Sequence, residues 1–255
     1  MNAPNLGFIN KGRNMAKLVK KGNDLAINYY KTVLKSILAF FASMGIFGAL
    51  LWFFDAMASG ARIAMAICGT IFLVASLVLR RRAHILNAGL QGEKTAAEVL
   101  KALPNGYTVV KNAVISHQGK QSELDLIIVG ESGVFVVEAK NMKGDVYGDC
   151  DDKNWRKEKH RGENVYRDEF YSPVKQVRTH VHRLAGLLRD KGIKVFVEGV
   201  VYFASDEAVL HISGDSNGIA VLAFTQGDDV LVDHILSGKA NLDPATQKRI
   251  LKALK

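Results

Sequence analysis

Two acidic side chains are spaced along the chain so that they could share one site. Asp125 and Glu138 lie in two segments rich in β-branched residues, 123–129 and 134–140, which a four-residue turn separates. If the two segments pair as a hairpin across that turn, Asp125 lies directly opposite Glu138. Opposed side chains in a sheet are roughly 5 Å apart, and two carboxylates at that distance repel each other. The pattern therefore predicts a compensating positive charge at this position.

A divalent cation would compensate the two carboxylates. Carboxylate oxygens are hard ligands that suit Mg²⁺ or Mn²⁺, and two of them with a backbone carbonyl leave positions for water and a phosphate. Lys140 is two residues beyond Glu138, so its side chain points to the same face. An ammonium at that place could orient an attacking water or offset charge on a phosphate.

A solvated surface is the alternative interpretation of the same hairpin. The pairing that sets Asp125 opposite Glu138 also sets Glu123 opposite Lys140. On a half-exposed face, Glu123 and Lys140 would form a surface ion pair worth under about 1 kcal/mol. These residues alone do not decide between a metal site and a solvated face.

Helix and strand patterns surround this hairpin and would position its side chains. One helix is expected to begin at Ser172 as N-cap, with Pro173 as its first residue, and to stop at Gly192. The other expected elements are an amphipathic helix over Ala88–Leu103, strands at 107–116, 123–129, 134–140, 145–149, 195–203 and 219–224, and short helices near 229–236 and 244–254. This order predicts an α/β domain in which a mixed sheet is flanked by helices.

Two apolar runs precede this domain. Ser36–Phe54 has 19 residues without a charge, and Ala61–Leu79 has 19 interrupted only by Arg62. At 1.5 Å per residue each run is roughly 28 Å long, which is close to the thickness of a bilayer's hydrocarbon core. The runs predict a transmembrane helical hairpin. A buried soluble hairpin would usually keep a polar stripe, and a signal peptide cut near Ala56-Met57-Ala58 would not start its apolar core at residue 36.

The formal net charge of +9 is concentrated around these runs. Residues 1–35 have seven Lys or Arg against one Asp, and three arginines at 80–82 follow the second run. The chain from residue 83 onward has 23 basic and 23 acidic residues, and the six-residue loop between the runs has no Lys or Arg. The positive-inside rule therefore predicts two spans in the inner (cytoplasmic) membrane with both termini in the cytoplasm. The basic segment could also lie on anionic lipid headgroups.

These patterns predict three regions. A basic cytoplasmic segment is expected over 1–35, a transmembrane hairpin over 36–82 with spans at about 36–54 and 61–79, and a cytoplasmic domain with C-terminal helices over 83–255. Cys68 and Cys150 are too few for a disulfide framework and lack zinc-ligand spacing, so free thiols in a reducing compartment are expected.

A basic segment with aromatic residues, Lys153–Arg167, is expected to be a loop next to the hairpin. It would serve equally well as a contact surface for phosphate backbones or as a solvated loop. His180 and His182 are two residues apart on a helix, face different directions, and are assigned to the surface or to packing. The candidate nucleic-acid-binding residues are Lys153, Arg156, Lys157, Lys159 and Arg161.

Several stretches, taken in order, resemble the NERD (nuclease-related) domain. They are Gly89-Leu90-Gln91-Gly92-Glu93, the segments 123–129 and 133–141, Trp155, and Pro173-Val174-Lys175-Gln176. The resemblance covers roughly Ala88 to Phe224. That family is assigned to the PD-(D/E)xK nuclease-like superfamily, so the resemblance implies a restriction-endonuclease-like αβββαβ core. Leu124 stands where the superfamily name has a proline, a position that is loosely kept.

The resemblance also implies roles for individual residues. Carried over by position, Asp125 and Glu138 are metal ligands and Lys140 is the catalytic lysine. Glu93 on the first helix completes the acidic cluster as a further ligand, and Gln176 on the second helix positions metal or phosphate. The sequence does not distinguish a one-metal from a two-metal mechanism.

The expected function is that of a membrane-anchored nuclease that uses Mg²⁺ or Mn²⁺ to hydrolyse phosphodiester bonds of nucleic acid, with DNA as the favoured substrate. The alternative is a non-catalytic module that holds nucleic acid or a protein partner at the cytoplasmic face of the membrane. The apolar hairpin by itself would also suit a membrane-protein assembly factor.

Overall fold

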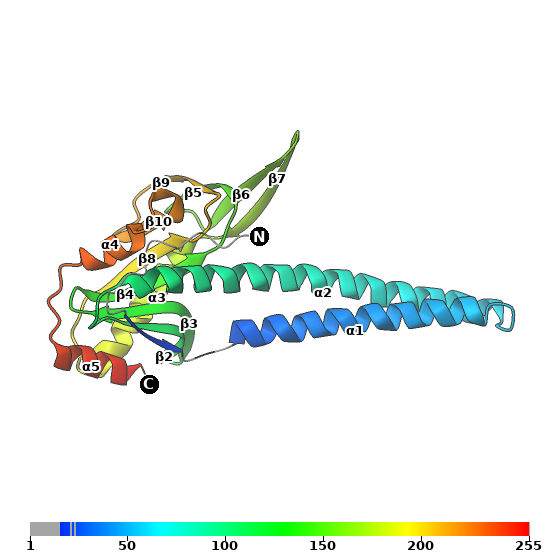
Figure 1. Ribbon diagram of the computed structural model, residues 1–255, viewed down its shortest axis with the longest axis horizontal. Coiled ribbons are helices and arrows are strands. Elements are labelled where there is room, and N and C mark those ends of the chain that lie inside the picture. The colour runs from blue at the N-terminus through cyan, green and yellow to red at the C-terminus, as the bar shows by residue number, and fades with distance from the viewer. Residues whose placement is uncertain (1–15, 21, 23, 255) are drawn as a thin grey trace. The chain divides into compact units, whose positions relative to one another are not determined.

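The computed structural model describes residues 16–20, 22 and 24–254 (Figure 1). These residues fall into two compact units. One unit consists of the described residues between 23 and 90. The other consists of the described residues between 1 and 22 and between 91 and 255.

Two long helices make up the first unit. Helix α1 spans Asp24–Trp52, and helix α2 spans Ser59–Val99, so its last turns belong to the second unit. Both helices are long and apolar enough to cross a membrane. The break expected between the second apolar run and a helix starting at Ala88 is wrong, because α2 is continuous over 41 residues. No Gly or Pro stands between residues 79 and 88, and Arg, Leu and Ala favour continued helix there.

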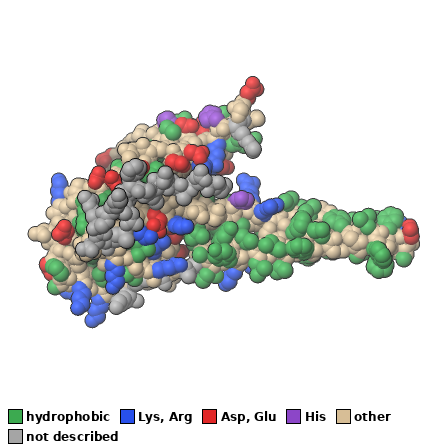
Figure 2. Space-filling view, viewed as in Figure 1, with side chains coloured by type: hydrophobic (Ala, Val, Ile, Leu, Met, Phe, Trp, Pro, Cys, Tyr) green, Lys and Arg blue, Asp and Glu red, His purple; other side chains and the backbone are tan. Residues whose placement is uncertain are grey.

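Small residues hold α1 and α2 together. Ser36 Oγ donates to the Ser76 carbonyl at 3.1 Å, and Ser76 Oγ donates back to the Ser36 carbonyl at 3.0 Å. Ser43 Oγ donates to the carbonyl of Gly69 at 2.9 Å. Most of the larger apolar side chains point outward instead, and Figure 2 shows them along the visible face of the two helices. Three serines of the pair therefore lie at the helix contact, and most of its large apolar side chains lie outside.

The second unit is built on a six-stranded mixed sheet, in the order β1-β2-β3-β4-β8-β10. Its strands are β1 (Lys17–Lys20), β2 (Thr108–His117), β3 (Lys120–Gly130), β4 (Gly133–Lys140), β8 (Val197–Phe203) and β10 (Ile219–Ala223). Strands β2, β3 and β4 pair antiparallel, whereas β8 pairs parallel with both β4 and β10. The expected α/β fold with a mixed sheet flanked by helices is confirmed.

Strand β1 is not among the elements expected from the sequence. It pairs parallel with β2, and Lys17 is the partner of Thr108. The backbone N–H of Ala16 also donates to the Leu103 carbonyl at 3.0 Å, and that of Lys17 donates to the Tyr107 carbonyl at 2.9 Å. Residues that precede the apolar helices in the chain therefore form an edge strand of the main sheet.

Helices cover both faces of this sheet. Helix α3 spans Pro173–Asp190 and buries Val177, Leu184 and Leu188 against one face. The end of α2, the short helix η1 (Leu100–Ala102) and helix α4 (Val230–Leu236) pack on the other face, and α5 (Pro244–Ala253) packs beside α3. The predicted caps of α3 are confirmed, since Ser172 Oγ accepts from the Lys175 N–H and Gly192 follows the helix at φ +70°.

A second sheet has the strand order β7-β6-β5-β9. Its strands are β5 (Gly144–Asp149), β6 (Asn154–Arg161), β7 (Asn164–Tyr171) and β9 (Ala208–Ser213). In the chain, β5, β6 and β7 lie between β4 and α3, and β9 lies between β8 and β10. The expected loop at 153–167 is wrong, because these residues lie mainly in the β6–β7 hairpin (Figure 1). A two-residue turn closes it, with Gly162 at φ +61°, a conformation that such hairpin turns require.

Candidate active site

The site lies where β3 and β4 stop pairing. The predicted register is confirmed near the turn, where Val129 pairs with Val134, and it continues as far as Leu126 with Val137. Beyond that pair, Asp125 Oδ2 accepts a hydrogen bond from the backbone N–H of Ala139 at 2.9 Å. The side chain of Asp125 thus takes the place that a backbone carbonyl of β3 would hold in a continued ladder.

The ladder is also interrupted on the other side of Asp125. Strands β2 and β3 pair on either side of Asn112 and Asp125, but these two residues are not themselves a pair. Asn112 has φ +51°, a left-handed conformation that Asn tolerates better than most residues. Its Nδ2 donates to Glu93 Oε2 at 2.6 Å. This kink directs the buried Asn112 side chain towards the end of α2.

Glu93 is buried near the site but is bonded to Asn112. Burial raises the pKa of Glu93, while the Asn112 hydrogen bond and the charge of Lys111 oppose that rise. The negative charge of Glu93 also contributes to raising the pKa of Asp125. The predicted third acidic residue therefore acts on the cluster through its charge, and its carboxylate is held by an amide.

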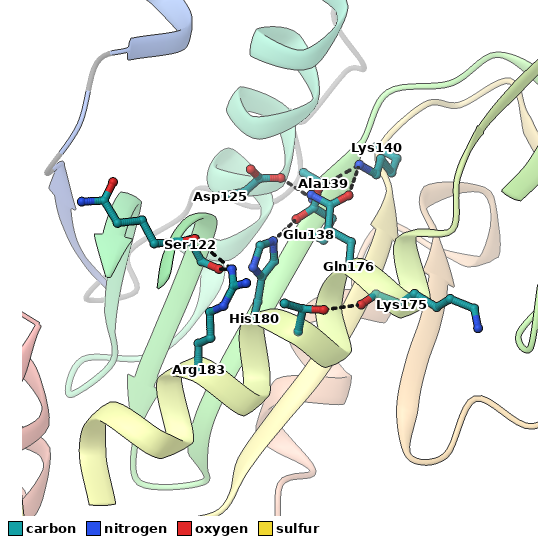
Figure 3. A network of polar contacts seen from close by, with 11 residues as sticks. Ser122, Asp125, Glu138, Ala139, Lys140, Lys175, Gln176, His180 and Arg183 are labelled. Atoms are coloured by element: carbon teal, nitrogen blue, oxygen red, sulfur yellow. Dashed lines mark hydrogen bonds and ion pairs between the residues drawn. The ribbon is translucent and has the colours of Figure 1, made fainter. Parts of the chain in front are cut away.

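Lys140 reaches across the end of β4 to helix α3. Its Nζ donates to Glu138 Oε1 at 2.8 Å and to Gln176 Oε1 at 3.1 Å (Figure 3). The ion pair between Lys140 and Glu123 that belongs to the alternative interpretation is absent from the part of the chain that the structure describes. Because the β3–β4 ladder ends before those residues, Glu123 stays exposed on β3 and Lys140 turns to Glu138.

His180 belongs to the same cluster, which the sequence argument missed. Its Nε2 lies 3.6 Å from Glu138 Oε2, and the side chain is 9% exposed. Neither ring nitrogen of His180, nor Glu138 Oε2, has a hydrogen-bond partner among residues 16–20, 22 and 24–254. A signal was available: Gln176 and His180 are four residues apart on one helix, so they share a face.

The two central carboxyl groups have opposite pKa shifts. Burial, and then the neighbouring Glu138 carboxylate, raise the pKa of Asp125 well above its ordinary value, although the Ala139 N–H opposes this. Burial also acts to raise the pKa of Glu138, but His180 and Lys140 outweigh it and lower that pKa. In the absence of metal, a proton shared by the pair therefore resides on Asp125, and Glu138 is ionised.

The donor set fits a hard divalent cation. Asp125 and Glu138 supply carboxylate oxygens, and the unpartnered Oε2 of the buried Glu138 is available for a ligand. Among the described residues, no three His, Cys, Asp or Glu side chains gather closely enough to hold a metal ion by themselves. Water and a substrate phosphate would therefore have to complete the coordination, as is usual for Mg²⁺.

The predicted nucleic-acid-binding residues lie on or beside the β6–β7 hairpin, away from this cluster in the sheet order. Arg156 and Arg167 both contact Glu158, at 3.0 and 2.9 Å, and Lys157 lies 3.7 Å from Asp168. Lys153 and Lys159 are exposed, and the side chain of Arg161 lies outside what the structure describes. Trp155 is buried in the core and donates its indole N–H to the Asp149 carbonyl.

Comparisons with known proteins agree with this geometry. An uncharacterized protein of Bacillus anthracis is 32% identical over 92 residues, which are 35% of this chain and 43% of that protein. The match thus spans less than half the length of this relative. No solved structure gives a significant match to the chain. Residues 88–204 match the model of the nuclease-related domain (NERD) family, and that range includes Glu93, Asp125, Glu138, Lys140 and Gln176. Residues 88–204 are therefore similar to a nuclease-related domain.

Proposed function

We propose that the protein is a membrane-anchored nuclease that hydrolyses phosphodiester bonds of nucleic acid with the help of Mg²⁺ or Mn²⁺. The observation that carries the proposal is the convergence of Asp125, Glu138 and Lys140 with Gln176 where the two central strands separate. The match of residues 88–204 to the nuclease-related family supports the same chemistry.

Asp125 and Glu138 are the residues that would hold the cation, with Glu93 adding negative charge nearby. A bound Mg²⁺ or Mn²⁺ polarises a phosphoryl oxygen and lowers the pKa of its own water. The pKa of Asp125 is raised in the metal-free protein, so binding of the cation competes with protonation of this carboxylate. Metal affinity should therefore weaken as the pH falls.

Lys140 is held so that part of its hydrogen-bonding capacity stays free. An ammonium group has three N–H donors, and the structure uses one towards Glu138 and one towards Gln176. The third donor is left for a phosphate oxygen or for the attacking water. Gln176 accepts through Oε1, so its amide nitrogen is also free to donate to a phosphate. Both groups would thus stabilise charge that develops on the phosphate.

The experiment is cleavage of plasmid DNA, linear DNA and RNA by the full chain in detergent, with Mn²⁺ or Mg²⁺ and with EDTA. Glu138→Gln and Lys140→Ala should each abolish metal-dependent cleavage. Lys143→Ala is the matched control, because Lys143 lies near the same strand end but pairs with the exposed Glu207. Cleavage that survives both site substitutions would rule out this assignment.

A non-catalytic binding module is the second candidate. It is favoured by the absence, within the described residues, of three metal-ligating side chains gathered in one place. Calorimetry separates the two candidates. The nuclease should bind Mn²⁺ and lose that binding with Asp125→Asn or Glu138→Gln. A chain that binds nucleic acid without metal dependence and never cleaves it would be a binding module.

The proposal also sets α1 and α2 in the inner membrane. Their outward side chains are largely apolar, and only a small part of each apolar stretch is buried, as expected for helices that face lipid. Lys31, Lys35 and the arginines at 80–82 lie at the ends of the apolar stretches away from the connecting loop 53–58, which has no Lys or Arg, so both termini should lie in the cytoplasm. A reporter fused after Lys255 should be active only inside the cell, and one in the loop only outside. Outside activity of the first fusion would contradict this topology.

A further inference from the structure

A basic cavity lies beside the candidate active site, between α3 and the turn that joins β2 to β3. Its volume is about 360 Å³. We call it the α3 pocket. It is lined by His117, Gln118 and Lys120 of the turn and by Arg178, Thr179, His182 and Arg183 of α3. None of these seven side chains is acidic.

Three cations of the α3 pocket have no carboxylate within ion-pair distance among the described residues. Lys120, Arg178 and Arg183 form no ion pair with any carboxylate in the described part of the chain. The one acidic contact of a lining residue is that of His117, whose Nδ1 lies 3.1 Å from Asp190 Oδ2. The pocket therefore gathers three permanent cations without an opposing anion.

One guanidinium of the pocket has an unsatisfied donor. Arg178 donates through Nη2 to the Asp215 carbonyl at 3.2 Å, but its buried Nε has no hydrogen-bond partner among the described residues. A buried N–H without a partner costs free energy, so such a group is usually paired with a ligand, an ion or water. An oxyanion in the pocket would compensate the charge of this guanidinium.

Arg183 is held in place by hydrogen bonds to strand β3. Its Nη1 donates to the Gln121 carbonyl at 2.8 Å and to Ser122 Oγ (Figure 3). Gly186 adds to this fit, because a Cβ there would collide with the His117 ring. The turn and the helix thus hold the pocket in one shape, which favours binding because little conformational entropy remains to be lost.

The α3 pocket lies a short distance from the catalytic cluster along the same two elements. Gln176 and Arg183 are seven residues apart on α3, which is about 10 Å along the helix. Ser122 and Asp125 are three residues apart on β3, which is also about 10 Å. One nucleic-acid strand that passes the candidate active site could therefore also contact the pocket.

The β6–β7 hairpin is a poorer candidate for such a contact. Its segment 153–171 has six Lys or Arg but also four Asp or Glu, and Arg156, Lys157 and Arg167 are engaged in ion pairs across the two strands. A phosphate would have to compete with carboxylates already in place. The number of basic residues led the sequence argument to the hairpin, whereas the arrangement of charges favours α3.

We propose that the α3 pocket binds a backbone phosphate of the nucleic acid near the bond that is cleaved. Lys120, Arg178 and Arg183 supply the positive charge. This inference rests on the proposed function for the identity of the ligand, but binding by the pocket does not require that cleavage occurs.

The test is the affinity of the full chain in detergent for a fluorescent DNA duplex, measured in EDTA over a range of salt concentrations. The double variant Lys120→Glu with Arg178→Gln should bind about tenfold more weakly or worse, as expected for loss of charge-assisted hydrogen bonds. The slope of log affinity against log salt should fall by about one for each lost phosphate contact. If the double variant folds poorly, Lys120→Glu alone replaces it, because the Lys120 side chain is exposed. This single variant should show part of the loss of DNA affinity.

Two matched variants decide the location. Arg189→Gln with Lys194→Glu makes the same charge change at exposed positions near the end of α3 and should keep the affinity. Lys153→Gln with Lys159→Glu makes it on the β6–β7 hairpin. An unchanged affinity of the pocket variants, or a larger loss in the hairpin variant, would overturn the proposal.

Cleavage by the same proteins separates this inference from the proposed function. Weaker DNA binding by the pocket variants, with no cleavage by the wild type, would support the pocket and refute the nuclease. Metal-dependent cleavage with full affinity in the pocket variants would support the nuclease and refute the pocket.

Discussion

The two ends of the β3–β4 pair differ in their side chains and in how regularly the strands pair. At the turn end, residues 127–129 pair in register with 134–136, and every one of these side chains is buried and apolar. At the far end the pairing stops, and Asp125, Glu138 and Lys140 occupy the space between the strands and α3. The candidate site therefore lies where the regular pairing of β3 with β4 ends.

Electrostatics explains why the ladder ends there. Two opposed carboxylates in a continued sheet would face each other without water or a donor between them. The separation of the strands lets Asp125 accept the Ala139 N–H and lets Glu138 meet Lys140 and His180. The apolar end has no such conflict and pairs regularly.

The largest expected effect of a single substitution is at the polar end. Lys140→Ala removes the ammonium that would meet the developing phosphate charge, so kcat for cleavage should fall about 10²–10³-fold, as for loss of other charge-stabilising donors. The free energy of unfolding should also fall, because the buried Glu138 carboxylate loses its ammonium partner, so kcat is compared per folded molecule. Steady-state cleavage and chemical denaturation of the same preparations measure both. Wild-type turnover in Lys140→Ala would remove Lys140 from the mechanism.

The opposite pattern is expected at the apolar end. Ile127 is fully buried between the sheet and α3, so Ile127→Ala should lower the free energy of unfolding by about 2–4 kcal/mol through lost burial and a cavity. The kcat per folded molecule should stay near the wild-type value. Denaturation curves and active-site titration provide the two numbers. A large loss of kcat in folded Ile127→Ala would show that the two ends are not independent.

Local chemistry made part of this architecture predictable. Ser172, Pro173 and Gly192 mark the ends of α3 because capping and turn conformations depend on residue type alone. The β3–β4 register near the turn follows from a tight connection between two apolar strands. The resemblance to the nuclease-related domain then directed attention to the residues that gather at the end of that register.

Non-local contacts explain what the sequence could not show. Strand β1 pairs with β2, which lies about ninety residues further along the chain, so its short polar sequence contains no sign of its partner. Strands β6 and β7 are rich in charged residues that suit a loop equally well, and their pairing is stabilised by ion pairs across the hairpin. His180 entered the site only because α3 lies over the place where the strands part.

The pH dependence of stability offers a third test of the polar end. The folded-state pKa of Asp125 is raised above its unfolded value, so in the metal-free protein the folded state binds more protons and the free energy of unfolding falls as the pH rises from about 4 through the raised pKa. Asp125→Asn keeps an acceptor for the Ala139 N–H. Because an amide does not ionise, the variant does not lose this stability as the pH rises. A tenfold change in proton affinity is worth about 1.4 kcal/mol, and each kcal/mol moves the melting temperature by about 2–4 °C.

Melting temperatures in EDTA should therefore diverge with pH. Near pH 4 the variant and the wild type should melt together, and at pH 8 Asp125→Asn should melt a few degrees higher. Excess Mn²⁺ should reverse the order at pH 8, because only the wild type keeps both carboxylates. Identical melting temperatures across this range would mean that folding does not raise the pKa of Asp125.

The smallest effect is expected at Glu123, and it tests where the ladder ends. A hairpin that stayed paired to its far end would set Glu123 against Lys140, and removing that carboxylate would then free Lys140 and alter cleavage. In the observed structure Glu123 is exposed on β3 and Lys140 is engaged with Glu138 and Gln176. Glu123→Gln should therefore change kcat less than about twofold and the free energy of unfolding by less than about 0.5 kcal/mol, as for an ordinary surface substitution.

Gln176→Ala, which removes a hydrogen-bond partner of Lys140, is the matched comparison and should lower kcat several-fold more. A greater loss in Glu123→Gln than in Gln176→Ala would show that β3 and β4 remain paired through the site in solution.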